Sequence, residues 1–582
     1  MRWTPILALT SLMLSSHVAL ACGGMFCDAT TPVNQAAERI LFAETDDGLE
    51  MHVRITYAGP PTEFGWLLPV PRDVQYELGS EALFNQLDNQ YAPIFNLITE
   101  FIGDCDFPAA ANDSGFAEGG AGGAGGGGGG IQVLAREPVG PYDLAVLLPS
   151  TVDDLRTWLE SNEYQIPDQI DEKLTPYIEM DAAFIALKLL PSSGEGDIQP
   201  LSMRFAGDIP SIPIIPTSVA ADPDMGMLVH LLGRSRAVPT NYRHVEINEA
   251  ALDWFNSGSN YADVVSQAID EAGGQAFTTD FAGQVRDRQP LFIADLNRLE
   301  SIDELNFSLL SDEDYRTGLR AFVTLPENIT FDEFSNCIFC YDDQINAGEI
   351  AIDLDGYRQA IRDEINPRRS AINALFARNP YLTRLYSTMS ADEMTVDPAF
   401  GFNADLEDVD NLRTPTQYIR CEEGGFGDQA TVIRGPSGVT FTSNQSLIRR
   451  MDGETVRGMD VPGARLIEQY RPAGQPTLLE DKREQIAEVA IPGQGTGGTG
   501  GAAGAGGAGG GAGFVGLNGN GWDGIGASSD GGNDSGGCAC DVGQQQSTSG
   551  LFLVGLMMFG MLRRRRGHSK SARPEGDVTV KR

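Results

Sequence analysis

Cys337 and Cys340 are the residues whose type and spacing come nearest to a known chemistry. A Cys-x-x-Cys pair forms a disulfide, supplies two of the four ligands of a zinc ion, or exchanges disulfides when one thiol ionises easily. Four carboxylates flank the pair, at Asp332, Glu333, Asp342 and Asp343. Their negative charge raises the thiol pKa, and no second close cysteine pair completes a zinc site. We therefore predict a structural disulfide, with metal binding and redox catalysis as alternatives.

Histidine, the commonest general base, is scarce in the body of the chain, where only His52, His230 and His244 occur. His52 falls on the polar face of a predicted strand, so we expect it to face solvent. His230 lies in the apolar run MLVHLL and is expected in the core. His244 begins HVEINE, which lacks the HExxH spacing of zinc proteases. The sequence GPSG at 435–438 likewise lacks the GxSxG spacing of serine hydrolases.

Acidic clusters are plentiful. The run DLDG at 353–356 resembles part of a calcium loop, but an EF-hand placed on it would begin at Ala351 and end at Arg362, so it fails at both positions. A second run contains Asp405, Glu407, Asp408 and Asp410. We interpret both as solvated acidic surface, with incidental calcium binding left open and no other cofactor expected. A hydrolase using two carboxylates stays an alternative, because their separation is spatial.

The overall charge limits the classes of partner. The chain of 582 residues has 81 acidic and 41 basic side chains, a net charge of −40 and a pI near 4.3. Nucleic acid is excluded as a partner, because phosphate contacts need a basic surface. The length allows two to four ordinary domains, and 41% hydrophobic residues suffice for a sizeable core.

The N-terminus has the features of a secretory signal peptide. Arg2 is followed by an apolar stretch from Ile6 to Leu14, and the small residues Ala19 and Ala21 form a cleavage site. Cleavage after Ala21 assigns 1–21 to the signal and leaves Cys22 as the new N-terminus. Lipid attachment at Cys22 is the alternative to simple export.

The exported body has six cysteines, which allow up to three disulfides in fifteen pairings. They are Cys22, Cys27, Cys105, Cys337, Cys340 and Cys421. The sequence does not choose among the pairings.

Two glycine-rich tracts divide the chain. We predict a disordered insertion at 108–130 within the body 22–492, and a flexible linker at 493–537. As a random coil the linker spans about 35–40 Å, which suits a tether that holds a domain away from a membrane.

A membrane segment is predicted after the linker, within 538–566. The apolar stretch from Gly550 to Leu562 spans about 20 Å as a helix, shorter than the ~30 Å hydrocarbon core. Arginines that follow it, Arg563, Arg564, Arg565 and Arg566, mark the cytoplasmic side. The basic tail 567–582 is then cytoplasmic. An apolar helix that packs on the protein surface is the alternative.

Between the tracts the chain alternates strand and helix patterns without a fixed repeat, which predicts the α+β class with mixed or antiparallel sheets. The predicted strands are Arg39–Glu44, Leu49–Tyr57, Phe64–Val70, Tyr142–Leu148, Phe184–Leu190, Leu201–Phe205, Met227–Leu232, His244–Ile247 and segments of Gln417–Ser443. The first two are expected to form a β-hairpin, because the sequence DDG at 46–48 makes the turn between them. The predicted helices are Ser80–Tyr91, Val152–Glu160, Ile170–Ile178, Ala250–Phe255, Tyr261–Glu271 and most of Leu291–Ser390, where Ser370–Ala377 is best marked. Ser80 is the predicted N-cap of the first of these helices.

The body resembles a family of exported bacterial proteins catalogued as a domain of unknown function, family 2330. The resemblance rests on CGGMFC, GWLLPVP, VGPYDLAVL, ALKLLPSSGEGDIQPL, AVPTNYRHVEIN, NYADVVSQAIDEAGGQAF and NPYLTRLYSTMSADEMTVDPAF, from Cys22 to Cys421. It implies export, but no activity, substrate or catalytic residues.

The C-terminal tail resembles the MYXO-CTERM sorting tail of myxobacteria. Cys538 and Cys540 precede the apolar segment and the arginine cluster, in the order that this tail shows. The resemblance implies that a sorting protease cuts near the cysteines and leaves the protein on the cell surface.

These features predict an exported protein held at the cell envelope, anchored in the membrane at least before processing. The first functional hypothesis is a non-enzymatic surface or binding module whose extracellular ligand is unknown. The alternative is an envelope hydrolase that uses acidic residues, which a cleft lined by buried carboxylates with shifted pKa values would favour.

Overall fold

The computed structural model describes residues 18–20, 24–25, 34–58, 64–102, 132–164, 166–167, 169–190, 198–285, 310, 312–326, 328–422, 425–426, 431–443 and 461–486. Ten of the described strands form one mixed sheet. In spatial order they are β28 (Thr477–Asp481), β27 (Ala464–Gln469), β16 (Arg243–Ile247), β17 (Ala276–Gln284), β20 (Tyr381–Met389), β14 (Ala221–Gly233), β3 (Asn34–Glu44), β4 (Leu49–Ala58), β12 (Leu201–Phe205) and β6 (Gln75–Leu78).

A second sheet, antiparallel throughout, packs against the first. Its strands are β2 (Gly24–Met25), β5 (Gly65–Val70), β11 (Ala183–Leu189), β10 (Tyr142–Leu148) and β9 (Gln132–Val139). Alternate residues of both sheets, such as Trp66 and Ile185 on one and Phe42 and Met51 on the other, are buried in one shared core. The period of two in each strand places these side chains on the facing surfaces.

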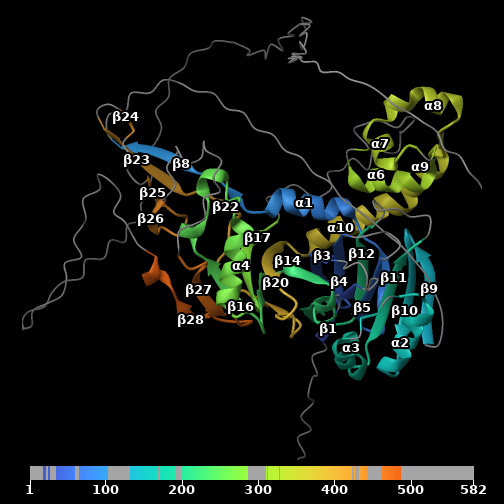
Figure 1. The fold of residues 1–582 in the computed structure, drawn as a ribbon, viewed down its shortest axis with the longest axis horizontal. Helices are drawn as coiled ribbons and strands as arrows, with labels where there is room; N and C mark the ends of the chain where they lie inside the picture. The colour runs from blue at the N-terminus through green and yellow to red at the C-terminus, as the bar shows by residue number, and fades with distance from the viewer. Residues whose placement is uncertain are drawn as a thin grey trace, which may run out of the picture. The chain divides into compact units, whose positions relative to one another are not determined.

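Helices cover the outer face of each sheet (Figure 1). Helices α2 (Val152–Ser161) and α3 (Ile170–Glu179) pack on the five-stranded sheet through Trp158 and Tyr177. On the large sheet lie α1 (Glu81–Tyr91), α10 (Asn366–Arg378) and α4 (Tyr261–Glu271). The result is four layers, helix–sheet–sheet–helix.

A group of helices with its own core is inserted before α10, and we call residues 310–365 the helical lobe. It contains α6 (Glu313–Leu319), α7 (Phe331–Asn336), α8 (Asp342–Ala347), α9 (Leu354–Ala360), the π-helical turn Ile361–Ile365 and the strand pair β18 (Val323–Thr324) and β19 (Ala351–Ile352). Its core includes Phe334 and Tyr357, both fully buried.

Smaller elements complete the fold. A further sheet contains β8 (Ile98–Ile102), β23 (Thr416–Glu422), β24 (Gly425–Phe426), β25 (Thr431–Arg434) and β26 (Thr440–Ser443). Three strand pairs are β1 (Val18–Leu20) with β13 (Ile209–Ser211), β15 (Arg236–Pro239) with β21 (Phe400–Asn403), and β7 (Ile94–Phe95) with β22 (Leu412–Arg413). The described 3-10 turns are Pro216–Val219, Glu249–Ala251, Trp254–Asn256, Arg320–Phe322, Ile338–Tyr341 and Arg483–Gln485.

The α+β class is confirmed by these mixed sheets and helices, and so is the hairpin of β3 and β4. Two local predictions are wrong. Ala250–Phe255 holds two short 3-10 turns in place of a helix. The segment predicted as helical to Ser390 ends in β20, because Pro380 follows α10 and the alternating run after it pairs with β14 and β17.

Candidate functional site

Charged side chains of the large sheet and of α1 meet where this helix packs on the sheet, and we call this set the charge layer. Its members are Arg39, Arg54, Asp280 and Arg384 of the sheet and Glu81 and Asp88 of α1. Asp88 of α1 accepts from two strands at once, with Arg39 Nη1 at 2.6 Å and Arg384 Nη2 at 3.4 Å. Arg384 also pairs with Asp280, whose side chain is fully buried. Each charge therefore has an opposite charge within reach, as burial of ions requires.

Asp280 is the deepest member of the charge layer. It sits at a bulge of β17, where the register against β20 shifts between Thr279 and Phe281. The Tyr261 hydroxyl donates to it, and burial followed by the Asp280 charge raises the Tyr261 pKa well above its usual value. The Tyr261 proton is thus fixed as a donor, and the carboxylate is satisfied from two sides.

His230 lies next to Arg384 in the register of β14 and β20 and is fully buried. Burial first, then the charges of Arg384 and Arg39, lower its pKa well below the ordinary value. The core position predicted for this histidine is confirmed, and it stays neutral at physiological pH.

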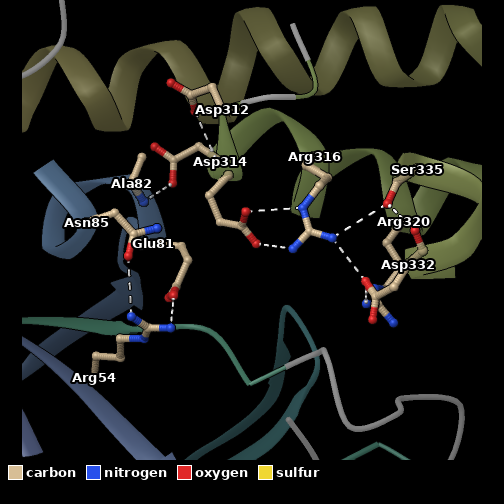
Figure 2. A network of polar contacts seen from close by, with 11 residues as sticks. Arg54, Glu81, Ala82, Asn85, Asp312, Asp314, Arg316, Arg320, Asp332 and Ser335 are labelled. Carbon is tan, nitrogen blue, oxygen red and sulfur yellow. Dashed lines mark hydrogen bonds and ion pairs between the residues drawn. The ribbon is translucent and has the colours of Figure 1, made fainter. Parts of the chain in front are cut away.

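The N-terminus of α1 joins the sheet to the helical lobe (Figure 2). Ser80 caps α1 by accepting from the Leu83 amide at 3.1 Å, as predicted for this helix start. Asp314 of α6 accepts from Ser80 Oγ at 2.7 Å and from the Ala82 amide at 3.2 Å. A buried carboxylate of the lobe therefore fixes the first turn of α1.

Glu81 is a second carboxyl at this junction whose pKa is raised. It pairs with Arg54, which also donates to Asn85 at 3.5 Å. Burial is the largest cause that raises the pKa of Glu81, and the neighbouring charges of Glu313 and Asp314 raise it further. The charge of Arg54 lowers the pKa, and the result is about 7. Glu81 can therefore bind a proton near neutral pH.

A hydroxyl and a carboxylate flank the imidazole ring of His244. Its Nε2 lies 2.9 Å from Thr279 Oγ1 and its Nδ1 lies 3.8 Å from Glu468 Oε2. The types match a hydrolytic triad, but all three residues are buried and the Tyr470 ring lies 4.4 Å from the imidazole ring. Arg236 also donates to Thr279 Oγ1 at 3.1 Å. Because all three residues are buried, the group forms a hydrogen-bond network within the core.

A cleft of about 440 Å³ lies where α10 meets the turn between β3 and β4 and the neighbouring residues of β4 and β12. Its floor is Glu50, which accepts from Arg204 Nε at 2.7 Å and from His52 Nε2 at 3.0 Å. Burial raises the Glu50 pKa, but these hydrogen bonds and charges outweigh it and bring the pKa to about 2. Glu50 is thus a permanent carboxylate and cannot act as a general acid.

The expectation that His52 faces solvent is wrong. Its ring is almost fully buried, because β12 pairs beside it and α10 packs on its cross-strand neighbour Leu41. Apolar and polar residues alternate along β4 as predicted, but both faces of the strand are covered. A strand buried on both faces still shows alternation when its second face buries paired charges.

The predicted disulfide joins Cys337 and Cys340 in the helical lobe, with Cα atoms 5.3 Å apart. It bridges the end of α7 and the 3-10 turn Ile338–Tyr341. Ile338 and Tyr341 pack on the lobe core, since residues three apart in a 3-10 turn share one side. Phe339 therefore points outward and is 68% exposed, which forfeits about 1.5–3 kcal/mol of burial.

Carboxylates surround this turn, and we call residues 337–343 the lobe tip. Asp332 is paired, with Arg316 at 3.0 Å and Arg320 at 3.4 Å. Asp342 and Asp343 are exposed, and no cation among the described residues pairs with either. The tip thus combines an exposed aromatic ring with unpaired negative charge.

The two acidic runs lie on the exposed surface, as predicted, and some of their carboxylates also make local contacts. Asp353 caps α9 by accepting from the Gly356 amide at 3.0 Å, and Asp355 pairs with Arg358 at 3.0 Å. Asp408 accepts from Tyr381 at 2.6 Å. Among the described residues, no group of three or more His, Cys, Asp or Glu side chains is placed to hold a metal ion.

Several predicted sites fall outside the described residues. These are Ala21, Cys22, Cys27, Cys105, Cys538, Cys540, Arg563, Arg564, Arg565 and Arg566. Cys421 lies in β23, and its pairing stays a prediction. Of the helices in the part of the chain that the structure describes, none is long and apolar enough to cross a bilayer.

Comparison with known proteins gives one match. A family model described as an uncharacterized protein conserved in bacteria (DUF2330) matches residues 16–333. The match ends just before the lobe tip, and the resemblance predicted from there to Cys421 stays a prediction. No curated protein and no solved structure matches the chain.

Proposed function

The protein belongs to the family DUF2330, whose model matches more than half of the chain, and we propose that it acts as an exported, envelope-anchored binding module without catalysis of its own. The observation that supports this most is the lobe tip, where a disulfide holds Phe339 in solvent beside unpaired carboxylates. Disulfides persist in oxidising compartments outside the cytoplasm. Aromatic residues are enriched among the residues that anchor protein interfaces.

The cleft offers less support to the alternative, an envelope hydrolase that uses carboxylates. Such an enzyme needs one carboxyl that stays protonated beside one that stays ionised. Glu50 in the cleft is ionised, and carboxyls with raised pKa values lie elsewhere, with Glu81 at about 7 and Asp397 at about 6. The raised carboxyls and the cleft are therefore separate features.

Export and anchoring are tested on intact cells that make the full chain. We expect an added protease to release fragments of the body from the cell surface, and non-reducing peptide mapping to find Cys337 linked to Cys340. A matched variant that lacks residues 1–21 should stay inside the cell with both thiols free. Protection of the wild-type body from protease, with free thiols, would refute the proposal.

The predicted tail is tested with a variant that stops after residue 537. Without the apolar segment and the arginines, we expect the body to appear in the medium and to leave the membrane fraction. In the wild type, a mature chain that ends near Cys538 would support processing by a sorting protease, and survival of Arg582 would make the tail a permanent anchor. A truncated chain that stays on the envelope would contradict anchoring through this segment.

A further inference from the structure

The lobe tip is a rigid turn that exposes an aromatic side chain. Phe339 has a larger exposed fraction than the other exposed large hydrophobic side chains of the described residues, at 68% against 57% for Met180. Its neighbours Ile338 and Tyr341 are anchored in the lobe core, where the Tyr341 ring lies 5.8 Å from that of Phe334. The ring is thus held outward by a turn whose other side is fixed.

Three local devices restrict movement of this turn. The disulfide closes it, a capping box between Thr330 and Glu333 fixes the start of α7, and Gly348 ends α8 in the left-handed conformation at φ 75°. A partner that contacts Phe339 therefore has little loop entropy to remove on binding. Pre-organisation of this kind lowers the cost of ordering the turn when a partner binds.

The charge around the lobe tip indicates which class of partner it can bind. From Phe331 to Tyr357 the lobe has seven carboxylates and no lysine or arginine. Asp342, Asp343 and Glu349 are exposed, and none of them pairs with a cation among the described residues. A second copy of the chain, with its net charge of −40, would be repelled, whereas a cationic surface would be attracted.

We propose that the lobe tip docks a cationic amphipathic segment of another protein, with aliphatic side chains on Phe339 and Lys or Arg side chains beside Asp342 and Asp343. This deepens the proposed function by naming the class of partner, and it rests on that proposal for its location outside the cell. The aromatic anchor supplies the apolar contact, and the carboxylates supply attraction and orientation.

The test uses the full chain purified in detergent and a labelled peptide of about a dozen alternating Lys and Leu residues, a length that spans the tip. We expect binding that weakens with added salt. Phe339→Ser and the double change Asp342→Asn with Asp343→Asn should each weaken it about tenfold or more. Peptides with Glu in place of Lys, or Ser in place of Leu, should not bind.

Matched controls separate the tip from general attraction to an acidic protein. Met180→Ser removes another exposed apolar side chain, and Asp46→Asn with Asp47→Asn removes two exposed charges at the cleft. Both controls should bind the peptide as the wild type does. If they weaken binding as much as the tip variants, or if the tip variants bind normally, the proposal fails.

A second readout guards against variants that misfold. Hydrogen exchange of the wild-type chain should show new protection at 337–343 when the peptide is added. Protection elsewhere alone would refute docking at the tip. Binding to neutral phosphatidylcholine vesicles through Phe339, with none to the peptide, would also overturn the proposal, in favour of membrane contact.

The two proposals fail separately. Peptide binding at the tip by a protein that cell shaving places inside the cell would refute export and leave the docking chemistry standing. If the protein is displayed on the surface but its tip does not bind the peptide, the docking chemistry is refuted and the envelope location stands.

Discussion

The charge layer beneath α1 and the lobe tip both contain carboxylates but use them in opposite ways. In the charge layer, Asp280 is fully buried against Arg384, and Asp88 is shared by two arginines. At the tip, Asp342 and Asp343 lie in solvent beside Phe339. Charge in the first region holds strands and helix together, whereas charge in the second is exposed and available to a binding partner.

This contrast shows why composition is a poor guide to the role of a carboxylate. A buried ion must be paired, so its partners are part of the fold and its removal destabilises the protein. An exposed ion costs little to leave unpaired and contributes little to stability. The difference predicts which substitutions damage folding and which affect only binding.

The largest effect is expected from Asp280→Ala. The change leaves Arg384 buried without its main partner and removes the acceptor of Tyr261, so we expect a loss of about 3–5 kcal/mol in the free energy of unfolding. Urea denaturation of the purified chain measures it. A loss below about 1 kcal/mol would show that this buried pair does not hold β17 to β20 and α4.

Removal of the disulfide should have the next largest effect. Its loop is short, so the chain-entropy estimate for Cys337→Ser with Cys340→Ser is about 2 kcal/mol. The loss should be confined to the helical lobe, with faster hydrogen exchange in α7 and α8 and unchanged exchange in β14 and β20. Equal acceleration in those central strands would contradict an independent lobe core.

Glu81 makes the charge layer sensitive to pH. Its pKa of about 7 in the folded protein exceeds the usual value of 4.5, because burial and the charges of Glu313 and Asp314 outweigh Arg54. The folded state therefore binds this proton more tightly, which stabilises the protein fully below about pH 4.5, and this stabilisation is lost as pH rises through about 7.

The test compares wild type with Glu81→Gln, which cannot ionise. Between pH 8 and pH 5.5 the wild type should gain about 1–2 kcal/mol relative to the variant. The difference between the two stability curves isolates Glu81 from the other carboxyls that titrate in this range. Parallel curves would mean that Glu81 ionises at its ordinary pKa.

Local sequence signals anticipated the elements that depend on neighbours along the chain. The Ser80 cap, the alternation of β4 and the Cys337–Cys340 disulfide all follow from short spacings. Burial of His52 was missed because it depends on β12 and α10, which are far away in sequence. The contact of His244 with Thr279 likewise arises only because β16 and β17 pair.

The charge layer could not be predicted for the same reason. On α1, Glu81, Asn85 and Asp88 are spaced as one polar stripe, a pattern typical of a solvent-facing side of a helix. The stripe is covered because Arg54, Arg39 and Arg384 stand opposite it on three strands. Only the order of strands in the sheet brings these arginines together.

The smallest effect on stability is expected at the lobe tip, where Phe339→Ser and Asp343→Asn should each change the free energy of unfolding by less than about 0.5 kcal/mol. Neither side chain is buried, and no cation among the described residues loses a partner. The same Phe339→Ser variant should lose peptide binding about tenfold. The aromatic ring and the carboxylates exposed on this closed turn add no stability of their own, in contrast to the strictly paired buried charges. Denaturation and binding should therefore respond to different sets of side-chain substitutions. If Phe339→Ser instead destabilises the lobe as much as loss of the disulfide does, the tip is part of the lobe core and the contrast between the two regions disappears.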